Sequence, residues 1–86
     1  MNTEFLLMAQ YSGQAIIPLE TIRRDYFSHL SWRVFLRKLE SGEIAIPVCR
    51  IETSQKGAKG VHLTDFAIYL DGRREAALRE LQALKA

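Results

Sequence analysis

Basic side chains gather in the middle of the chain, and their chemistry is that of phosphate and base recognition. Between residues 31 and 60 six basic residues face only three acidic ones, Glu40, Glu43 and Glu52; the six are Arg33, Arg37, Lys38, Arg50, Lys56 and Lys59. Lysine and arginine neutralise phosphates, and arginine can also hydrogen-bond to guanine in the major groove. Since the formal net charge of the whole chain is only +2, the indication of DNA binding comes from placement rather than from bulk charge.

Other chemistries have little support in the sequence. Cys49, His29 and His62 are scattered without ligand spacing, whereas a structural zinc site normally takes four ligands. No serine or cysteine stands at a spacing that pairs it with a histidine, and the run 56–60 lacks the spacing of a phosphate-binding glycine loop. We therefore expect no metal, no cofactor and no catalysis.

The central basic residues Arg33, Arg37 and Lys38 fall on a predicted helix from Trp32 to Ser41. Ser31 is a good N-cap, and Gly42 is suited to end the helix. At 100° per residue the apolar residues share one side and the basic residues the other. The inner side holds Trp32, Phe35, Leu36 and Leu39, and the outer side Arg33, Val34, Arg37, Lys38 and Ser41.

A shorter helix is predicted before it, from Pro18 to about Ser28. Proline suits the first turn of a helix, and Leu19, Ile22 and Tyr26 follow at helical spacing on one face. A tight turn at 28–30 then joins the two helices. This pattern predicts a helix-turn-helix.

After Gly42 the hydrophobic period changes to that of strands. Residues 48–53 and 60–63 read as a pair of strands, joined by the polar loop 54–59. Ile44 and Ile46 alternate only as far as Pro47, which limits that stretch to an edge or a turn. A hairpin beside a helix-turn-helix is a wing.

The two ends of the chain are less regular. Residues 2–12 fit either a strand, which would form a hairpin with 15–17, or a helix capped by Asn2 or Thr3, and we favour the helix. Thr64 is expected to cap a further helix, with Phe66, Tyr69 and Leu70 towards the core. Residues 72–86 are also expected to be helical, either continuous with that helix or separated from it by a kink or end at Gly72.

Together these elements predict a mainly α fold with a small β-hairpin, a winged helix-turn-helix with a C-terminal helix. A length of 86 residues allows a single domain over 1–86, with its core in 15–70. The longest apolar run is far shorter than the ~20 residues of a membrane span. With one cysteine, a cytoplasmic protein without a disulfide is the expectation. A stripe on the last helix, suited to packing on a second copy, holds Leu70, Ala77, Leu81 and Leu84.

Roles in DNA binding follow from these positions. We expect Arg33 and Arg37 to read bases, and Val34 to meet a thymine methyl group. Contacts to the phosphate backbone are assigned to Arg24, Lys38, Ser54, Gln55, Lys56 and Lys59. Ser31, at the start of the second helix, is also counted as a DNA-binding residue.

The sequence also resembles a known family over nearly its whole length. The opening 2–11, the stretches 15–20, 24–27, 35–38, 54–57 and 59–63, and Tyr69-Leu70-Asp71 with Arg73-Arg74 are similar to the pyocin activator (PrtN) family. The resemblance implies a bacterial transcriptional activator that binds promoter elements of phage-tail-like bacteriocin or prophage genes in the DNA-damage response. More distantly, the predicted fold is similar to that of excisionases and MerR-type DNA-binding domains.

The expected partners are therefore double-stranded promoter DNA, a second copy of the chain, and RNA polymerase if activation requires a direct contact with it. Two other interpretations stay open. One is an excisionase-like architectural protein that bends DNA, because the same fold serves both tasks. The other is a protein-interaction module such as an anti-repressor, which predicts no salt-dependent affinity for DNA.

Overall fold

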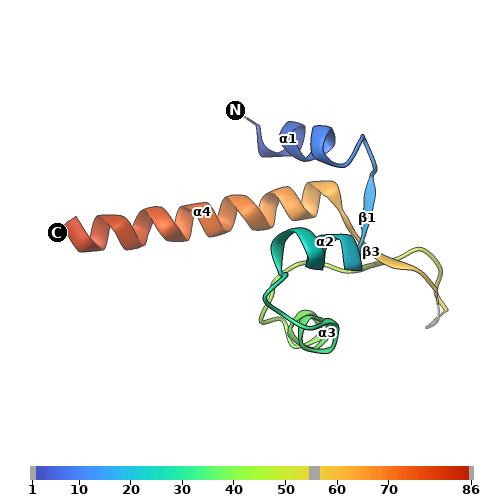
Figure 1. Ribbon diagram of the computed structural model, residues 1–86. Helices are drawn as coiled ribbons and strands as arrows, with labels where there is room; N and C mark the ends of the chain where they lie inside the picture. The colour runs from blue at the N-terminus through green and yellow to red at the C-terminus, as the bar shows by residue number, and fades with distance from the viewer. Residues whose placement is uncertain (1, 55–56, 86) are drawn as a thin grey trace.

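The structure, a computed structural model, describes residues 2–54 and 57–85. A short N-terminal helix, a helix-turn-helix and a small sheet surround the beginning of one long helix (Figure 1). The elements are α1 (Thr3–Gln10), β1 (Ile16–Pro18), α2 (Leu19–Tyr26), α3 (Trp32–Glu40), β2 (Cys49–Arg50), β3 (Lys59–His62) and α4 (Leu63–Lys85). The mainly helical fold with a small antiparallel sheet and a C-terminal helix is confirmed, and it is compatible with a winged helix-turn-helix.

Residues 3–10 form a helix, as favoured from the sequence. The Asn2 side chain caps it by accepting a 2.8 Å hydrogen bond from the Glu4 backbone N–H. The helix is followed by Ser12 and Gly13, both in the left-handed region with φ of 55° and 75°. Leu7 and Tyr11, the residue directly after α1, are buried. One side of the helix therefore packs against the rest of the protein.

The sheet has three strands in the order β1-β3-β2, and both pairings are antiparallel. The predicted hairpin β2–β3 is present, but β1 adds a third strand in which Ile17 lies opposite Val61. Gly60 makes this pairing possible: a Cβ on it would lie 2.6 Å from Cγ2 of Ile16 and 2.7 Å from the carbonyl oxygen of Ile17. Residues 3–10 are therefore helical, while the stretch 15–17, which the sequence had offered as the partner of a strand at 2–12, pairs with β3 instead.

Several predicted boundaries differ from those observed. The strand β2 covers two residues rather than 48–53, and β3 begins at Lys59 and ends before Leu63. Thr64 does not cap α4, because the helix already begins at Leu63. Instead the backbone N–H of Thr64 donates to Nδ1 of His62 at 3.1 Å, and the Thr64 hydroxyl donates to Glu4 Oε1 at 3.0 Å.

The helices α2 and α3 form the predicted helix-turn-helix, although α2 ends at Tyr26, two residues earlier than expected. Arg23 holds the turn by donating to the Leu30 carbonyl at 2.9 Å and to the Glu20 carboxylate at 2.7 Å. The Phe27 ring in the turn lies 5.2 Å from the Phe35 ring, centroid to centroid. These contacts fix the angle at which α3 leaves the turn.

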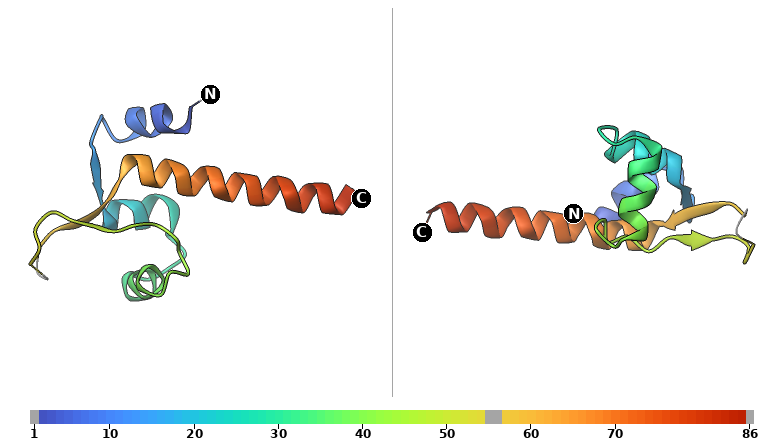
Figure 2. Two further views of the ribbon diagram at one scale, coloured as in Figure 1. Left: turned by 180° about the vertical axis from the view of Figure 1, so that it is seen from behind. Right: turned by 90° about the horizontal axis from the view of Figure 1, so that it is seen from below.

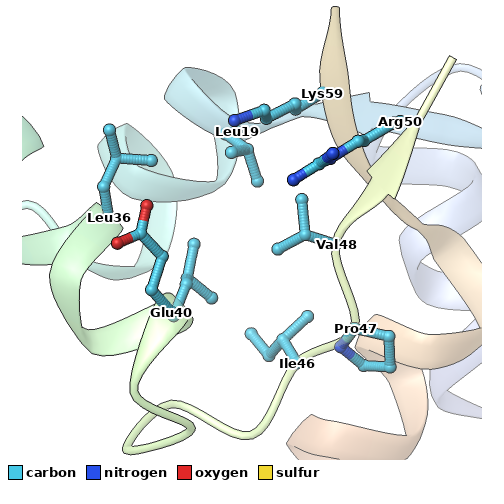
Figure 3. A pocket seen from close by; sticks show the side chains of 9 residues that line it. Leu19, Leu36, Glu40, Ile46, Pro47, Val48, Arg50 and Lys59 are labelled. Atoms are coloured by element: carbon cyan, nitrogen blue, oxygen red, sulfur yellow. The ribbon is translucent and has the colours of Figure 1, made fainter. Parts of the chain in front are cut away.

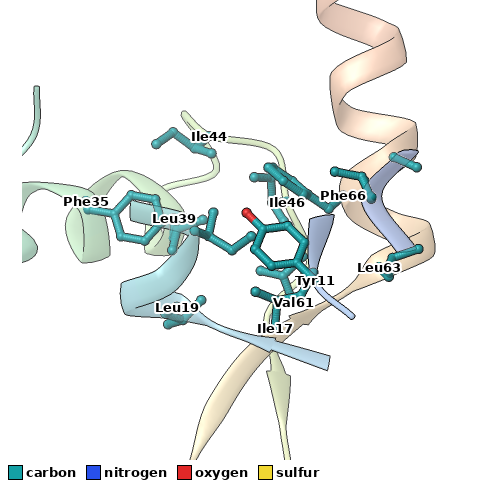
Figure 4. Close-up of a cluster of buried hydrophobic side chains, with 13 residues drawn as sticks. Tyr11, Ile17, Leu19, Phe35, Leu39, Ile44, Ile46, Val61, Leu63 and Phe66 are labelled. Carbon is teal, nitrogen blue, oxygen red and sulfur yellow. The ribbon is translucent and has the colours of Figure 1, made fainter. Parts of the chain in front are cut away.

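The core lies where the sheet, α3 and the beginning of α4 meet (Figure 4). Its fully buried large side chains come from five different elements: Ile17, Ile22, Phe35, Val61 and Phe66. Ile44 and Ile46, after α3, are also buried, and the backbone N–H of Ile44 donates to the Lys38 carbonyl at 3.0 Å. This segment closes the core between α3 and β2 without forming a strand.

The long helix α4 runs without interruption through Gly72. Apart from its chain neighbours and the backbone of the same helix, no described residue comes within 4 Å of the position that a Cβ on Gly72 would take, so the glycine neither ends the helix nor serves a close contact. The second half of α4 projects beyond the other elements and points away from the hairpin (Figures 1 and 2), and the molecule measures 50 × 28 × 21 Å. Among the described residues, no helix is long and apolar enough to cross a membrane.

Candidate nucleic-acid interface

The helix α3 is held by its cap and by its buried side. The Ser31 hydroxyl accepts a 3.2 Å hydrogen bond from the Val34 backbone N–H, which satisfies one of the free donors of the first turn. Phe35 and Leu39 are buried in the core, as predicted. Ser31 therefore already has a structural role at the start of the helix, apart from any contact with DNA.

Arg33 and Arg37 both lie exposed on the opposite side of α3. They are four positions apart, so they are neighbours on the helix surface. Within residues 2–54 and 57–85, no carboxylate lies at ion-pair distance from either guanidinium. Both arginines are therefore available to a ligand without the loss of an existing ion pair.

Three other predicted contact residues are more constrained. The Lys38 ammonium lies 3.2 Å from Oε2 of Glu43, and its side chain is about one third exposed (34%). Arg24 donates through Nε to Oδ1 of Asp25 at 3.0 Å, which raises the pKa of Arg24. Val34 is half-buried and presents less surface than its position on the helix suggested.

The hairpin places two basic residues side by side. Arg50 of β2 is the register partner of Lys59 of β3, and the backbone N–H of Ile51 donates to the Ala58 carbonyl at 3.0 Å beyond them. Lys59 was predicted as a contact residue, whereas Arg50 was counted only as part of the basic segment. Arg50 is identified as a candidate contact because it lies opposite Lys59 in the hairpin. That neighbour is known only once the register of the two strands is known.

Ser54 is the other predicted wing contact that lies within the described residues. Ser54 lies exposed, and its carbonyl accepts a 3.1 Å hydrogen bond from the backbone N–H of Gly57 in the turn. The predicted contacts at Gln55 and Lys56 lie outside the described residues. Of the wing cations, Arg50 and Lys59 are thus the ones that the structure places.

A hollow of about 340 Å³ separates α3 from the hairpin (Figure 3). Arg50 and Lys59 lie along one side of it, Glu40 of α3 lies on the other, and its floor is apolar, with Leu19, Ile46 and Val48. A second hollow of about 380 Å³ lies between Trp32 and the turn residues 57–59. A concave surface therefore runs between α3 and the hairpin β2–β3, with the cations Arg50 and Lys59 on the hairpin side.

Trp32 lines this second hollow and is 44% exposed. The sequence placed it on the inner side of α3, and its ring does lie 6.3 Å from the Phe35 ring, centroid to centroid. The indole is thus half in contact with the core and half open towards the wing. It lies where a bound polymer passing between α3 and the hairpin would meet it.

The predicted stripe on α4 divides into two parts. Leu70 packs against the core of its own chain. Ala77, Leu81 and Leu84 are exposed, Leu84 to 84%. Only the second part is available to another molecule.

In the part of the chain that the structure describes, no group of three or more histidine, cysteine, aspartate or glutamate side chains could hold a metal ion. Cys49 is a free, half-buried cysteine on β2.

Comparison with known proteins gives a family. The family model described as Pyocin activator protein PrtN matches residues 3–77, which includes every element from α1 to the middle of α4. The searches of curated proteins and of solved structures each found no match. The chain therefore belongs to the pyocin activator (PrtN) family, and this membership supports a role as a regulator of pyocin genes.

Proposed function

We propose that this protein regulates pyocin genes by binding specific DNA, with α3 in the major groove and the hairpin β2–β3 on the neighbouring backbone. The observation that carries the proposal is the pair Arg33 and Arg37, which are exposed on the outer side of α3 and have no ion-pair partner among the described residues. An α-helix fits the major groove, and arginine is the side chain that most often reads guanine there.

The wing residues Arg50 and Lys59 support the second half of the proposal. They face each other across β2–β3 and line the hollow beside α3. Two adjacent cations on the same hairpin suit two successive phosphates of one strand. Phosphate contacts fix the position of a protein on DNA but carry no sequence information. The proposed role of Arg50 and Lys59 is therefore to set the register of α3 along the duplex.

The ion pairs refine the roles assigned from the sequence. Lys38 shares its charge with Glu43, and Arg24 shares its charge with Asp25. A phosphate contact by either cation must compete with the existing carboxylate, so its contribution is smaller than that of an unpaired residue. Arg50 takes the place of Lys38 in our assignment of the principal backbone contacts.

Regulation as an activator further requires a contact with RNA polymerase or a change in promoter geometry. We propose activation on the basis of family membership.

Selection of bound fragments from a random DNA pool, followed by salt titrations on the selected site and on unrelated DNA, tests the proposal. Arg37→Ala should cost about 1–3 kcal/mol on the selected site and much less on unrelated DNA. Arg50→Gln and Lys59→Gln should weaken both DNAs alike and lower the slope of log affinity against log salt by about one each.

Arg79→Gln is the matched control, because Arg79 is an exposed arginine on the projecting half of α4. It should leave both affinities and the salt slope close to those of the parent protein. An absence of salt-dependent DNA affinity in the parent would overturn the proposal and favour a protein-interaction module. If Arg37→Ala weakens both DNAs equally while Lys59→Gln abolishes only the sequence preference, α3 and the wing have exchanged roles.

A further inference from the structure

One stripe, apolar except at Arg74, runs along the whole of α4 and is only half covered. Its members alternate at spacings of four and three, which keeps them on one side of the helix: Leu63, Ala67, Leu70, Arg74, Ala77, Leu81 and Leu84. Leu63 and Ala67 are buried and Leu70 packs on the core, whereas Leu81 and Leu84 are 47% and 84% exposed. The side of the helix that faces its own domain therefore continues, exposed, beyond the edge of that domain.

We infer that the projecting segment 73–85 pairs with the same segment of a second copy in the antiparallel direction, with Ala77 opposite the partner's Leu81. In this register Arg74 lies opposite the partner's Leu84, and the aliphatic part of its side chain packs on that leucine. Arg73 lies level with the partner's Lys85. The two projecting segments then overlap along their full length of about 20 Å.

The direction follows from the position of the domain. Because the core packs on the same side of α4 as the exposed stripe, two parallel helices paired through this stripe would bring both domains into one space. In the antiparallel pair, the domains lie at opposite ends of the helical segment. The region of α4 that carries Leu63 to Leu70 then lies beyond Lys85 of the partner helix, so neither domain meets the described part of the opposite helix.

The charges beside the stripe favour the same direction. Positions on the flanks of an antiparallel pair bring Asp71 next to the partner's Lys85, twice by symmetry, and Leu78 next to the partner's Leu78. Asp71 accepts a 2.5 Å hydrogen bond from the Thr3 hydroxyl and borders a hollow of about 510 Å³ lined by Asn2, Thr3, Asp71, Arg74 and Glu75. This hollow can receive the ammonium of the partner's Lys85 between two carboxylates.

The parallel and antiparallel arrangements differ at Glu80. In a parallel pair Glu80 would lie beside the partner's Lys85, whereas in the antiparallel pair it lies beside the partner's Glu80. Removing its charge should therefore weaken a parallel dimer, but leave an antiparallel dimer unchanged or tighter. Asp71→Asn should instead weaken an antiparallel dimer and leave a parallel dimer unchanged. The asparagine oxygen can still accept the hydrogen bond from the Thr3 hydroxyl.

Cross-linking of the free protein, without DNA, tests the inference separately from the proposed function. Cys49, the single cysteine, is first replaced by serine, and then Leu78→Cys or Leu84→Cys is added; both leucines are exposed. In the antiparallel pair the two copies of residue 78 are adjacent, whereas the copies of residue 84 are about 15 Å apart along the axis. A short bis-maleimide should therefore give at least tenfold more covalent dimer with Leu78→Cys than with Leu84→Cys.

The reverse ratio would overturn the antiparallel direction, and no covalent dimer with either variant would overturn self-association through α4. Sedimentation equilibrium gives an independent measurement. Leu81→Glu should raise the dimer dissociation constant at least tenfold and Asp71→Asn several-fold, while Glu80→Gln should not raise it. A weaker dimer with Glu80→Gln would contradict the register, and circular dichroism checks that each variant keeps the helical content of the parent.

Discussion

The Tyr11 hydroxyl donates a 2.9 Å hydrogen bond to Oδ2 of Asp25 and thereby joins the end of α1 to α2. The other carboxylate oxygen of Asp25 accepts from Nε of Arg24 at 3.0 Å. The hydrogen bond from Arg24 and then that from Tyr11 hold the pKa of Asp25 below its ordinary value of 3.8. Burial and the hydrogen bond to Asp25 raise the pKa of Tyr11. The N-terminal helix is therefore tied to the helix-turn-helix through an ionised carboxylate.

Acid should weaken this connection. Because the pKa of Asp25 is lower in the folded than in the unfolded protein, its contribution to stability is complete above the unfolded value. That contribution is lost as the pH falls through the folded value. Urea unfolding between about pH 6 and pH 2 should show this loss, and Tyr11→Phe should make it shallower because the variant lacks one of the two donors. Curves for the parent and for Tyr11→Phe that stay parallel over this range would contradict the assignment.

Two glycines should respond in opposite ways to alanine. Gly60→Ala places a methyl group 2.7 Å from a backbone oxygen of β1, so we expect a destabilisation of about 1–3 kcal/mol. Gly72→Ala adds a methyl group to open space in a helix interior and should stabilise the protein by about 0.5–1 kcal/mol. Thermal unfolding of both variants measures the difference. Equal melting temperatures would show that β1 does not pack on β3 at Gly60.

The inner side of α3 should carry stability and its outer side should not. Phe35 is fully buried, so Phe35→Ala should cost about 3–5 kcal/mol, a large share of the stability of a small domain. Arg37→Ala, two positions further on the exposed side, should change the unfolding free energy by less than about 0.5 kcal/mol. If Phe35→Ala melts like the parent, the assignment of the two sides is reversed.

Glu43 should restrain DNA binding through Lys38. The 3.2 Å ion pair between them must open or be shared before Lys38 can neutralise a phosphate. Glu43→Gln should raise the affinity for selected and unrelated DNA alike, and steepen the slope of log affinity against log salt by up to about one. Glu52→Gln, which removes an exposed acid from the wing, is the control for the change in net charge. An equal gain in both variants would mean that Lys38 makes no phosphate contact.

The single tryptophan supplies an optical measurement. Trp32 is 44% exposed beside the turn of the wing, so DNA that contacts both α3 and the hairpin should shield it from solvent. We expect its fluorescence to change on titration with DNA, and its quenching by acrylamide to fall at saturation. In Arg37→Ala the same change should require more DNA. Unaltered fluorescence and quenching at saturation would place the DNA away from this hollow.

Much of the fold followed from signals that lie close together in the chain. Ser31 before an amphipathic segment and Gly42 after it predicted α3, because caps and the helical period act within a few residues. The division of α3 into a buried and an exposed side followed from the same period. The two strands of the hairpin and the helical character of residues 72–85 were also visible, although the strands are shorter than their hydrophobic pattern suggested.

What the tertiary structure decided depends on residues far apart in the chain. The sequence offered 15–17 as a possible strand paired with 2–12, but the observed pairing of β1 with β3 depends on the missing side chain of Gly60. Arg50 becomes a neighbour of Lys59 only through the register of β2 and β3, and Lys38 is paired because the chain turns after α3 and returns Glu43 to it. Local period placed Leu70 on the same stripe as Leu81, yet only contact with the core covers one and leaves the other exposed. Caps and periods are read from neighbouring residues, whereas strand register, ion pairs and burial are set by which distant segments meet.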